Sequence, residues 1–447
     1  MSTPIPPVHV HREPLAGRRA LVAESVARTR TTLRDAVAGL GAEEIVCFER
    51  GSDVLEELRC QTYDLVVCGQ VYGDGLDSAM VLERIREHRL LPMWGTLVAI
   101  AAERTHRSVT GLAAHALDAC ILKPFSTGQV RERLLSVVNY KRRLEPIMTA
   151  VDNGDCEMAL AGCRILEARA TDLKAAGYRA ICERLINERQ ADRAESVLEE
   201  AMGFGEAPWM ALAQARIRLM QGQGAQAKQL LKKLVDERPE FIASYDALAS
   251  IEAASGEFLQ AVRHLQEANA RTGFSLRRLR RTGEYAARGG ELLLAERTLD
   301  RVMDKVYDSD LAEGSDYVNL VEVLAARGKL KRAEQVANEL RRAHSEHPDS
   351  LVVGPLVAYR RAFKEGDPRE CASTLAALLE ALQTAGSEVS VEVRIQVLEA
   401  CVEQQAREEA LEIARGIALT GHADRLKLRR VRELLDRGGR AEPAAGQ

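Results

Sequence analysis

Several features that mark common protein classes are scarce in this chain of 447 residues. Aromatic residues make up only 4% of it, and 62 Lys plus Arg nearly balance 66 Asp plus Glu, which leaves a formal net charge of -4. Such a balance argues against a dedicated nucleic-acid-binding protein. No apolar run reaches the roughly 18 residues that a membrane-spanning helix needs. The opening MSTPIPPVHVHREP has no apolar stretch typical of a signal peptide. We therefore expect a cytoplasmic protein, neither inserted in a membrane nor secreted.

The nine cysteines also lack the spacing of metal-binding or redox motifs. Their number is odd, no CxxC pair occurs, and most lie in apolar stretches such as VVCGQ and DACIL. This is typical of reduced, buried cysteines. His9 and His11 form only an isolated pair. No Ser/His/Asp or Cys/His arrangement, Gly-rich phosphate loop or metal-ligand spacing stands out, so we expect no enzyme activity, cofactor or metal.

The composition and the hydrophobic pattern of the sequence change once, near residue 140. Residues 1–17 contain four prolines and residues 438–447 read GGRAEPAAGQ, so both ends are expected to be flexible. Between them, residues 18–140 alternate β-rich runs with helical patterns. Residues 144–437 are dominated by the helix formers Ala, Leu, Glu, Arg and Gln. The sequence therefore predicts two folded domains with these bounds.

The junction between these domains lacks a Gly/Ser linker. A helix is expected over about 127–143, and Pro146 follows it. Because proline fits the first turn of a helix, we expect a new helix to begin there. We therefore expect a short, stiff connection between the two domains.

The first domain has the pattern of a parallel sheet. Five short apolar runs occur at 20–23, 44–48, 64–69, 96–101 and 119–122. Helical patterns follow them at about 26–40, 51–60, 77–88, 106–115 and from 127 onward. Strands that alternate with helices in this way predict a parallel sheet covered on both faces, with right-handed crossovers. This is an α/β doubly wound, flavodoxin-like fold, whose ligand site lies beyond the carboxyl ends of the strands.

The second domain carries a repeat of 34 residues. Three glycines lie 34 residues apart, at Gly222, Gly256 and Gly290. An alanine follows each glycine by five residues, and a leucine follows each alanine by four: Ala227, Ala261, Ala295, Leu231, Leu265 and Leu299. Weaker copies are marked by Gly154 with Ala159, Ala194, Gly328 with Ala333, Gly366 with Cys371, and Ala410. Glycine can end a helix through a positive φ, alanine allows close helix approach, and leucine buries one face. The repeat predicts helix pairs that must stack to bury that face.

This repeat resembles the tetratricopeptide repeat (TPR). The best unit, 242–275, has Tyr245, Leu248, Gly256, Phe258 and Ala261 at family positions, and the resemblance covers about 290 residues. It implies an all-α superhelical solenoid of about eight helix pairs, with a basic capping helix near 423–436.

The resemblance also implies a protein partner on the concave face, which the first helix of each pair lines. Candidate residues there are Trp209, Arg216, Asp246, Arg277 and Arg280. Each has a plainer structural interpretation. Trp209 can pack against the preceding pair, and the arginine run 276–281 can be a solvated helix face with its leucines pointing inward.

The first domain resembles the receiver (CheY-like) domain of bacterial response regulators. RALVAES and DLVVCG fit its first and third strands, and Lys123-Pro124-Phe125 is the most specific motif. The resemblance implies a peptide bond before Pro124 that is often cis. A working receiver needs a carboxylate nucleophile, acids that hold Mg²⁺, and a hydroxyl and a lysine that stabilise the transferred charge.

Most of these chemical positions are lost. Glu24 and Ser25 stand where an acidic pair is expected, and Gly69 (Gln70 if the register shifts by one) stands where the acceptor aspartate belongs. Ala101 replaces the hydroxyl residue and Cys120 the aromatic switch residue, so only Lys123 is intact. The residues predict a vestigial site in a pseudo-receiver that takes no phosphoryl group and serves as a docking module.

Three functions follow as hypotheses. The first is a non-enzymatic signalling adaptor that binds a two-component protein and a TPR ligand. The second is a phosphorylation-dependent response regulator with TPR output, in which Asp74 or Asp77 accepts the phosphoryl group. The third is a structural assembly factor that uses the array alone. Neither membrane insertion nor nucleic-acid binding is expected.

Overall fold

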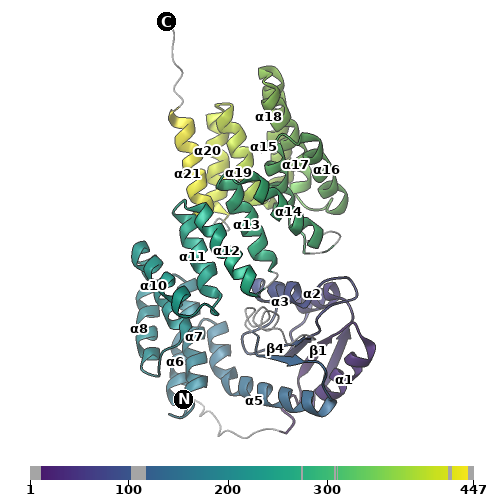
Figure 1. Ribbon diagram of the computed structural model, residues 1–447, viewed down its shortest axis with the longest axis vertical. Helices are drawn as coiled ribbons and strands as arrows, with labels where there is room; N and C mark the ends of the chain where they lie inside the picture. Colours follow the sequence, from purple (N-terminus) through teal and green to yellow (C-terminus); the bar gives the residue numbers. More distant parts are fainter. Residues whose placement is uncertain are drawn as a thin grey trace. The chain divides into compact units, whose positions relative to one another are not determined.

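The computed structural model of this chain describes residues 12–101, 117–272, 275–306, 309, 311–420 and 425–440 (Figure 1). The chain divides into two compact units. One comprises Met1–Ile251 and His264–Leu276, and the other Glu252–Arg263 and Arg277–Gln447. Among the described residues, none of the helices combines the length and apolar character that crossing a bilayer requires.

The first unit contains a five-stranded parallel sheet in the order β2-β1-β3-β4-β5. The strands are β1 (Arg19–Ala23), β2 (Glu44–Phe48), β3 (Leu65–Cys68), β4 (Thr96–Ala101) and β5 (Ala119–Leu122). They coincide with the five predicted runs, and their parallel pairing is confirmed. Every residue of β3 and β4 is buried, as expected for parallel strands with helices on the faces.

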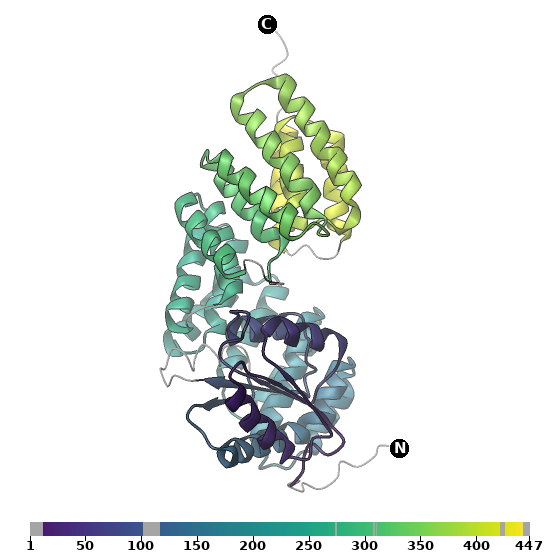
Figure 2. The same cartoon turned by 90° about the vertical axis from the view of Figure 1, so that its right-hand side faces the viewer.

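Helices lie on both sides of this sheet (Figures 1 and 2). They are α1 (Ala27–Ala38), α2 (Gly51–Cys60), α3 (Ser78–Glu87) and α5 (Thr127–Asp152). Leu33 of α1 and Leu134 of α5 join Val22, Val67 and Val98 of the strands in one core, while α2 contacts α3. The helix expected at 106–115 lies outside the described residues. The region is thus a small parallel α/β sheet, and its kinship to a receiver stays a prediction.

Helix α5 differs from the sequence prediction. We expected one helix to end near residue 143 and another to begin at Pro146, but α5 runs unbroken through Pro146. Its first half buries Val130 and Leu134 in the sheet core, and its second half buries Ile147 and Val151 in a helical core. Proline removes one backbone donor from a helix interior, yet tertiary packing on both halves keeps the helix intact. One helix therefore serves the sheet and the helical region together.

The described residues after α5 are all-helical. The helices are α6 (Cys156–Ile165), α7 (Thr171–Asn187), α8 (Ala191–Met202), α9 (Pro208–Met220), α10 (Gly224–Glu237), α11 (Ala243–Ala254), α12 (Phe258–Thr272), α13 (Leu276–Arg288), α14 (Leu292–Val306), α15 (Gly314–Ala326), α16 (Leu330–Ala343), α17 (Asp349–Glu365), α18 (Pro368–Ala385), the short 3₁₀ helix η1 (Gly386–Glu388), α19 (Val391–Glu403), α20 (Arg407–Leu419) and α21 (Arg425–Arg440). In chain order the described helices form pairs from α5–α6 to α19–α20, and α21 follows. The helices of several pairs contact each other, such as α7 with α8 and α17 with α18.

The turns inside the pairs have the predicted geometry. Gly222, Gly256 and Gly290 have φ values of 80°, 87° and 84°. The alanines five residues later are fully buried, and the leucines after them are at most 1% exposed. The 34-residue spacing therefore predicted both where the first helix ends and which residues face the core. This is a TPR-like helical solenoid pattern.

Two pairs reach the same turn without glycine. Arg189 and Gln405 lie five residues before Ala194 and Ala410, and their φ values are 60° and 58°. Both alanines are buried, so the register of the repeat is kept. A residue with a side chain costs roughly 1–2 kcal/mol in this left-handed conformation.

We expect Arg189→Gly and Gln405→Gly each to raise the free energy of unfolding by about 0.5–1 kcal/mol, after allowing for the greater chain entropy of glycine. Both side chains are exposed, so little contact is lost. Urea denaturation measures the change, and Gly256→Ala, the reverse exchange at an equivalent turn, should lose about 1 kcal/mol. Destabilisation by both glycine variants would contradict the strained turn.

Candidate functional site

Three of the residues predicted to form a vestigial receiver site meet at the carboxyl ends of the strands. Glu24 follows β1, Gly69 follows β3 and Lys123 follows β5. The Glu24 side chain is 2% exposed, and its Oε2 accepts a hydrogen bond of 3.0 Å from Lys123 Nζ. Its Oε1 accepts a bond of 3.1 Å from the Val26 N–H. Both carboxylate oxygens are thus engaged, and the charge of the buried acid is matched by one cation.

Gly69 has no room for a side chain. An added Cβ would lie 2.9 Å from Glu24 Oε2 and 3.0 Å from the Ala23 carbonyl oxygen. The Gly69 N–H donates to that same carbonyl at 2.6 Å. The Glu24 carboxylate therefore lies where a side chain at position 69 would begin.

Gly69→Ala is expected to lower the free energy of unfolding by about 1–3 kcal/mol, because the new methyl group overpacks against a buried ion pair and a backbone carbonyl. Thermal and urea denaturation measure it. Gly73→Ala is a matched control, since its Cβ would meet nothing nearer than the Glu49 carbonyl oxygen at 3.6 Å. Equal losses in the two variants would contradict the tight packing at Gly69.

The other three vestigial positions carry no phosphate chemistry of their own. The Ser25 hydroxyl donates to the Val71 carbonyl at 2.8 Å. Ala101 ends β4 and is 1% exposed, while Cys120 on β5 pairs in register with Ala99 on β4. Burial raises the pKa of the Cys120 thiol. Within the described ranges, no group of three His, Cys, Asp or Glu side chains is arranged to hold a metal ion.

Both candidate substitute acceptors hold the starts of helices. Asp74 Oδ2 accepts bonds from the backbone N–H and hydroxyl of Ser52 in the first turn of α2, at 2.9 and 3.0 Å. Burial alone would raise the pKa of Asp74, but the hydrogen bonds from Ser52 and Gly51 outweigh it and lower the pKa. Asp77 is the N-cap of α3 and accepts a bond of 2.9 Å from Met80 N–H. Caps of this kind contribute about 1 kcal/mol each.

In the first unit, the predicted partner-binding residues are only partly exposed. Trp209 of α9 packs against the core that α5 to α9 share. Arg216 of α9 donates to Asn187 Oδ1 at 3.0 Å. Burial lowers the pKa of Arg216, with Glu183 opposing the shift. Asp246 is half-buried on α11.

In the second unit, the arginine run of α13 divides into exposed and engaged residues. Arg277 is exposed, whereas Arg278 is buried, so the run is not the uniformly solvated helix face that was one of its two interpretations. Arg280 makes two bonds of 2.7 Å to the Asp316 carboxylate and one of 2.8 Å to Glu313. Asp316 is only 2% exposed, and burial raises its pKa although Arg280 opposes the shift. Arg280 therefore ties α13 to α15.

A second ionic cluster was missed by the sequence analysis. Arg360 of α17 contacts Glu403 at 2.8 Å, and Glu322 and Glu399 at 3.3 Å. Arg430 of α21 also meets Glu399 at 3.3 Å. Glu322, Arg360 and Glu399 are 38 and 39 residues apart, about one repeat at this end of the array. That spacing was the available signal, since it places the three on successive first helices.

Comparisons with known proteins add a likeness of fold. No protein-family model matches the chain, and no curated protein matches it. Among solved structures, it is similar to the C-terminal part of a TPR repeat-containing protein from Cytophaga hutchinsonii, with 14% identity, a TM-score of 0.42, and coverage of 55% of this chain and 99% of the other. A tetratricopeptide repeat protein from Parabacteroides merdae has 13% identity, a TM-score of 0.42, and coverage of 67% and 98%. Scores and identities this low carry no conclusion about function.

Proposed function

We propose that this chain is a non-enzymatic signalling adaptor in the cytoplasm of a bacterium. Its sheet region is a pseudo-receiver with a doubly wound, CheY-like fold that docks on a two-component signalling protein. Its TPR array binds a second protein. The phosphoryl switch of a working receiver plays no part in this function.

The observation that carries the proposal is the close packing of Gly69 against Glu24. A phosphoryl acceptor needs a carboxylate that projects from this position, and the Glu24–Lys123 pair already fills the space. A receiver switches because its phosphate favours one of two conformations. Without an acceptor, no phosphate can favour one conformation over the other. The domain then acts only through the surfaces by which it contacts other proteins.

The competing function, a response regulator phosphorylated at Asp74 or Asp77, is less well supported. Both carboxylates accept hydrogen bonds from backbone N–H groups at helix starts. In Asp74 both carboxylate oxygens accept hydrogen bonds, so attack on a phosphoryl donor would need one of them released. In Asp77 the cap bond engages Oδ1. The cap role explains both residues without further chemistry.

The full chain incubated with acetyl phosphate and Mg²⁺ should show no change in intact mass. A stoichiometric gain of one phosphoryl group would refute the adaptor. Loss of that gain in Asp74→Asn or Asp77→Asn would then establish the competing function, because asparagine keeps the capping oxygen but cannot form an acyl phosphate.

Point variants separate the two binding regions better than a deletion does. Removal of residues 1–140 would cut α5 in its middle and expose the apolar side chains that it buries. Arg277→Glu reverses an exposed charge on α13. It should reduce recovery of the array's partner from the source cell while leaving the thermal midpoint of the chain unchanged.

A further inference from the structure

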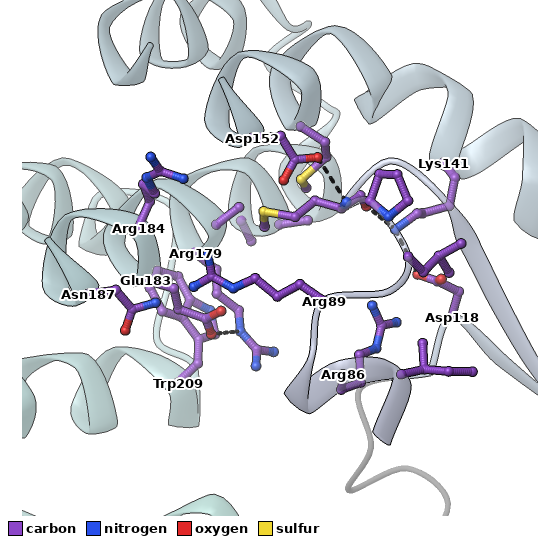
Figure 3. Close-up of a pocket in the computed structure, with 18 residues that line it drawn as sticks. Arg86, Arg89, Asp118, Lys141, Asp152, Arg179, Glu183, Arg184, Asn187 and Trp209 are labelled. Carbon is purple, nitrogen blue, oxygen red and sulfur yellow. Dashed lines mark hydrogen bonds and ion pairs between the residues drawn. The ribbon is translucent and has the colours of Figure 1, made fainter. Parts of the chain in front are cut away.

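The first unit has an open cavity of about 580 Å³ that is separate from the predicted vestigial receiver site. It lies between the end of α3, the segment 91–93, Asp118 and the helices α5, α7 and α9 (Figure 3). This volume is within the range of roughly 300–1,000 Å³ found for small-molecule sites. The sheet region and the first helix pairs both contribute side chains to it.

Positive side chains outnumber negative ones on the described walls. Five cations line the cavity, namely Arg86, Arg89, Lys141, Arg179 and Arg184. Three carboxylates face them, namely Asp118, Asp152 and Glu183. The lining therefore carries two more cations than carboxylates, although one of the cations, Arg184, pairs with Glu188 outside the lining.

The carboxylates are already committed to protein partners. Asp118 pairs with Lys141 at 3.2 Å and accepts a bond of 2.8 Å from Leu97 N–H. Asp152 accepts a bond of 3.0 Å from Met93 N–H. Burial lowers the pKa of Lys141 although Asp118 opposes the shift, and it lowers the pKa of Arg86 in the same way. The acids do not offset the desolvation of these two cations, so an anion in the cavity would be stabilised.

Arg89 is the cation best placed to meet such an anion. Arg89 follows His88, the C-cap residue of α3, and its backbone has a positive φ of 51°. Figure 3 shows its side chain extending across the cavity toward α7. Among the described residues, its guanidinium has no hydrogen-bond or ion-pair partner. Left-handed backbone of this kind costs energy and is held only where surrounding structure imposes it.

Apolar side chains form the rest of the lining. The largest of these side chains are Trp209, Met93 and Met148. Met148 belongs to the core that α5 to α9 share, and the other two pack against it. An indole beside arginines offers a flat surface for a ring, while the guanidinium groups offer paired donors for a phosphate.

We propose that this cavity binds a small phosphorylated ligand of the nucleoside monophosphate class. Arg89 and the neighbouring cations hold the phosphate, and the ring lies against Trp209. A phosphate monoester carries about -1.5 to -2 charges at pH 7, which the cations of the lining, Arg89 first among them, would offset. The site goes beyond the proposed adaptor function and stands whether or not that function is correct.

Isothermal titration calorimetry of the full chain tests this, with AMP and GMP, their nucleosides, and inorganic phosphate as probes. One nucleotide should bind at a single site, at least about tenfold more tightly than its nucleoside and than inorganic phosphate. Arg89→Gln should weaken that binding about tenfold or more, the loss expected for a charge-assisted contact. Arg28→Gln, at an exposed arginine on α1, should leave it unchanged.

Intrinsic fluorescence gives the location, because the only two tryptophans, Trp94 and Trp209, both pack on this core. Saturable quenching with the calorimetric affinity supports the site. The proposal is overturned if neither nucleotide binds at millimolar concentration, or if Arg89→Gln binds as tightly as Arg28→Gln. Inorganic phosphate that binds as tightly as either nucleotide would overturn the ring contact.

Discussion

Arg280→Met is expected to lower the free energy of unfolding by about 3–5 kcal/mol, because it leaves the carboxylate of Asp316 buried without its counter-charge. Asp316 is 2% exposed, and its two bonds of 2.7 Å to Arg280 satisfy both oxygens. The loss should appear in urea denaturation as a lower midpoint. A lower urea midpoint would show that the Arg280 side chain stabilises the packing of α13 against α15.

Arg277→Met is the matched control, since this arginine is exposed on the same helix. Its effect should stay within about 0.5 kcal/mol. The double variant Arg280→Met with Asp316→Leu should recover most of the loss, because replacing both members of a buried pair by apolar residues is often close to neutral. If Arg280→Met were as stable as the control, Arg280 would be a free surface cation, available to a partner as the TPR resemblance implies.

Arg360→Met is expected to cost about 2–4 kcal/mol, since three carboxylates then lose their common cation. The Arg360 side chain is only 11% exposed, and Glu322, Glu399 and Glu403 all lie within 3.3 Å of it. These residues belong to α15, α17 and α19, so the variant should loosen three helix pairs together. Hydrogen exchange would show this as faster exchange in all three helices.

The loss in Arg360→Met should depend on pH. Burial raises the pKa of Glu322, while Arg360 opposes the shift. Without Arg360 the pKa rises further, so the folded variant binds a proton more readily than the unfolded chain does. Protonation therefore stabilises the folded variant at low pH, and this stabilisation is lost as the pH rises through the folded pKa. The deficit relative to the parent chain should shrink from pH 7 toward pH 4, and a constant deficit would contradict the role of Glu322.

Periodicity was enough to predict most of the local structure. The five apolar runs of the first domain became five parallel strands, because a buried strand needs a continuous apolar run. Gly256, Ala261 and Leu265 fixed a turn, a close helix approach and a buried face. Each of these positions favours one residue type for a steric reason, so spacing revealed them.

The sequence analysis failed where tertiary packing overrides a local preference. Pro146 suggested a new helix, but cores on either side hold α5 continuous. Arg189 and Gln405 gave no sign of their left-handed turns, because neither residue type favours that conformation. The partners of Arg280 and Arg360 lie in other repeats, and only a register between repeats could have paired them.

The candidate sites, too, were predictable from the sequence only in part. The lack of a side chain at Gly69 was evident from the sequence, but the filling of that space by Glu24 needed coordinates. The cavity beside Arg89 had no sequence signal. Its lining comes from segments more than a hundred residues apart, from Ile85 to Trp209.

The central claim, that the sheet region works without a phosphoryl switch, is tested most directly by hydrogen–deuterium exchange of the full chain with and without acetyl phosphate and Mg²⁺. The account predicts identical exchange in peptides that cover residues 65–78 and 119–126, where the vestigial site and its neighbouring loops lie. Protection that appears there only when both reagents are present would contradict it.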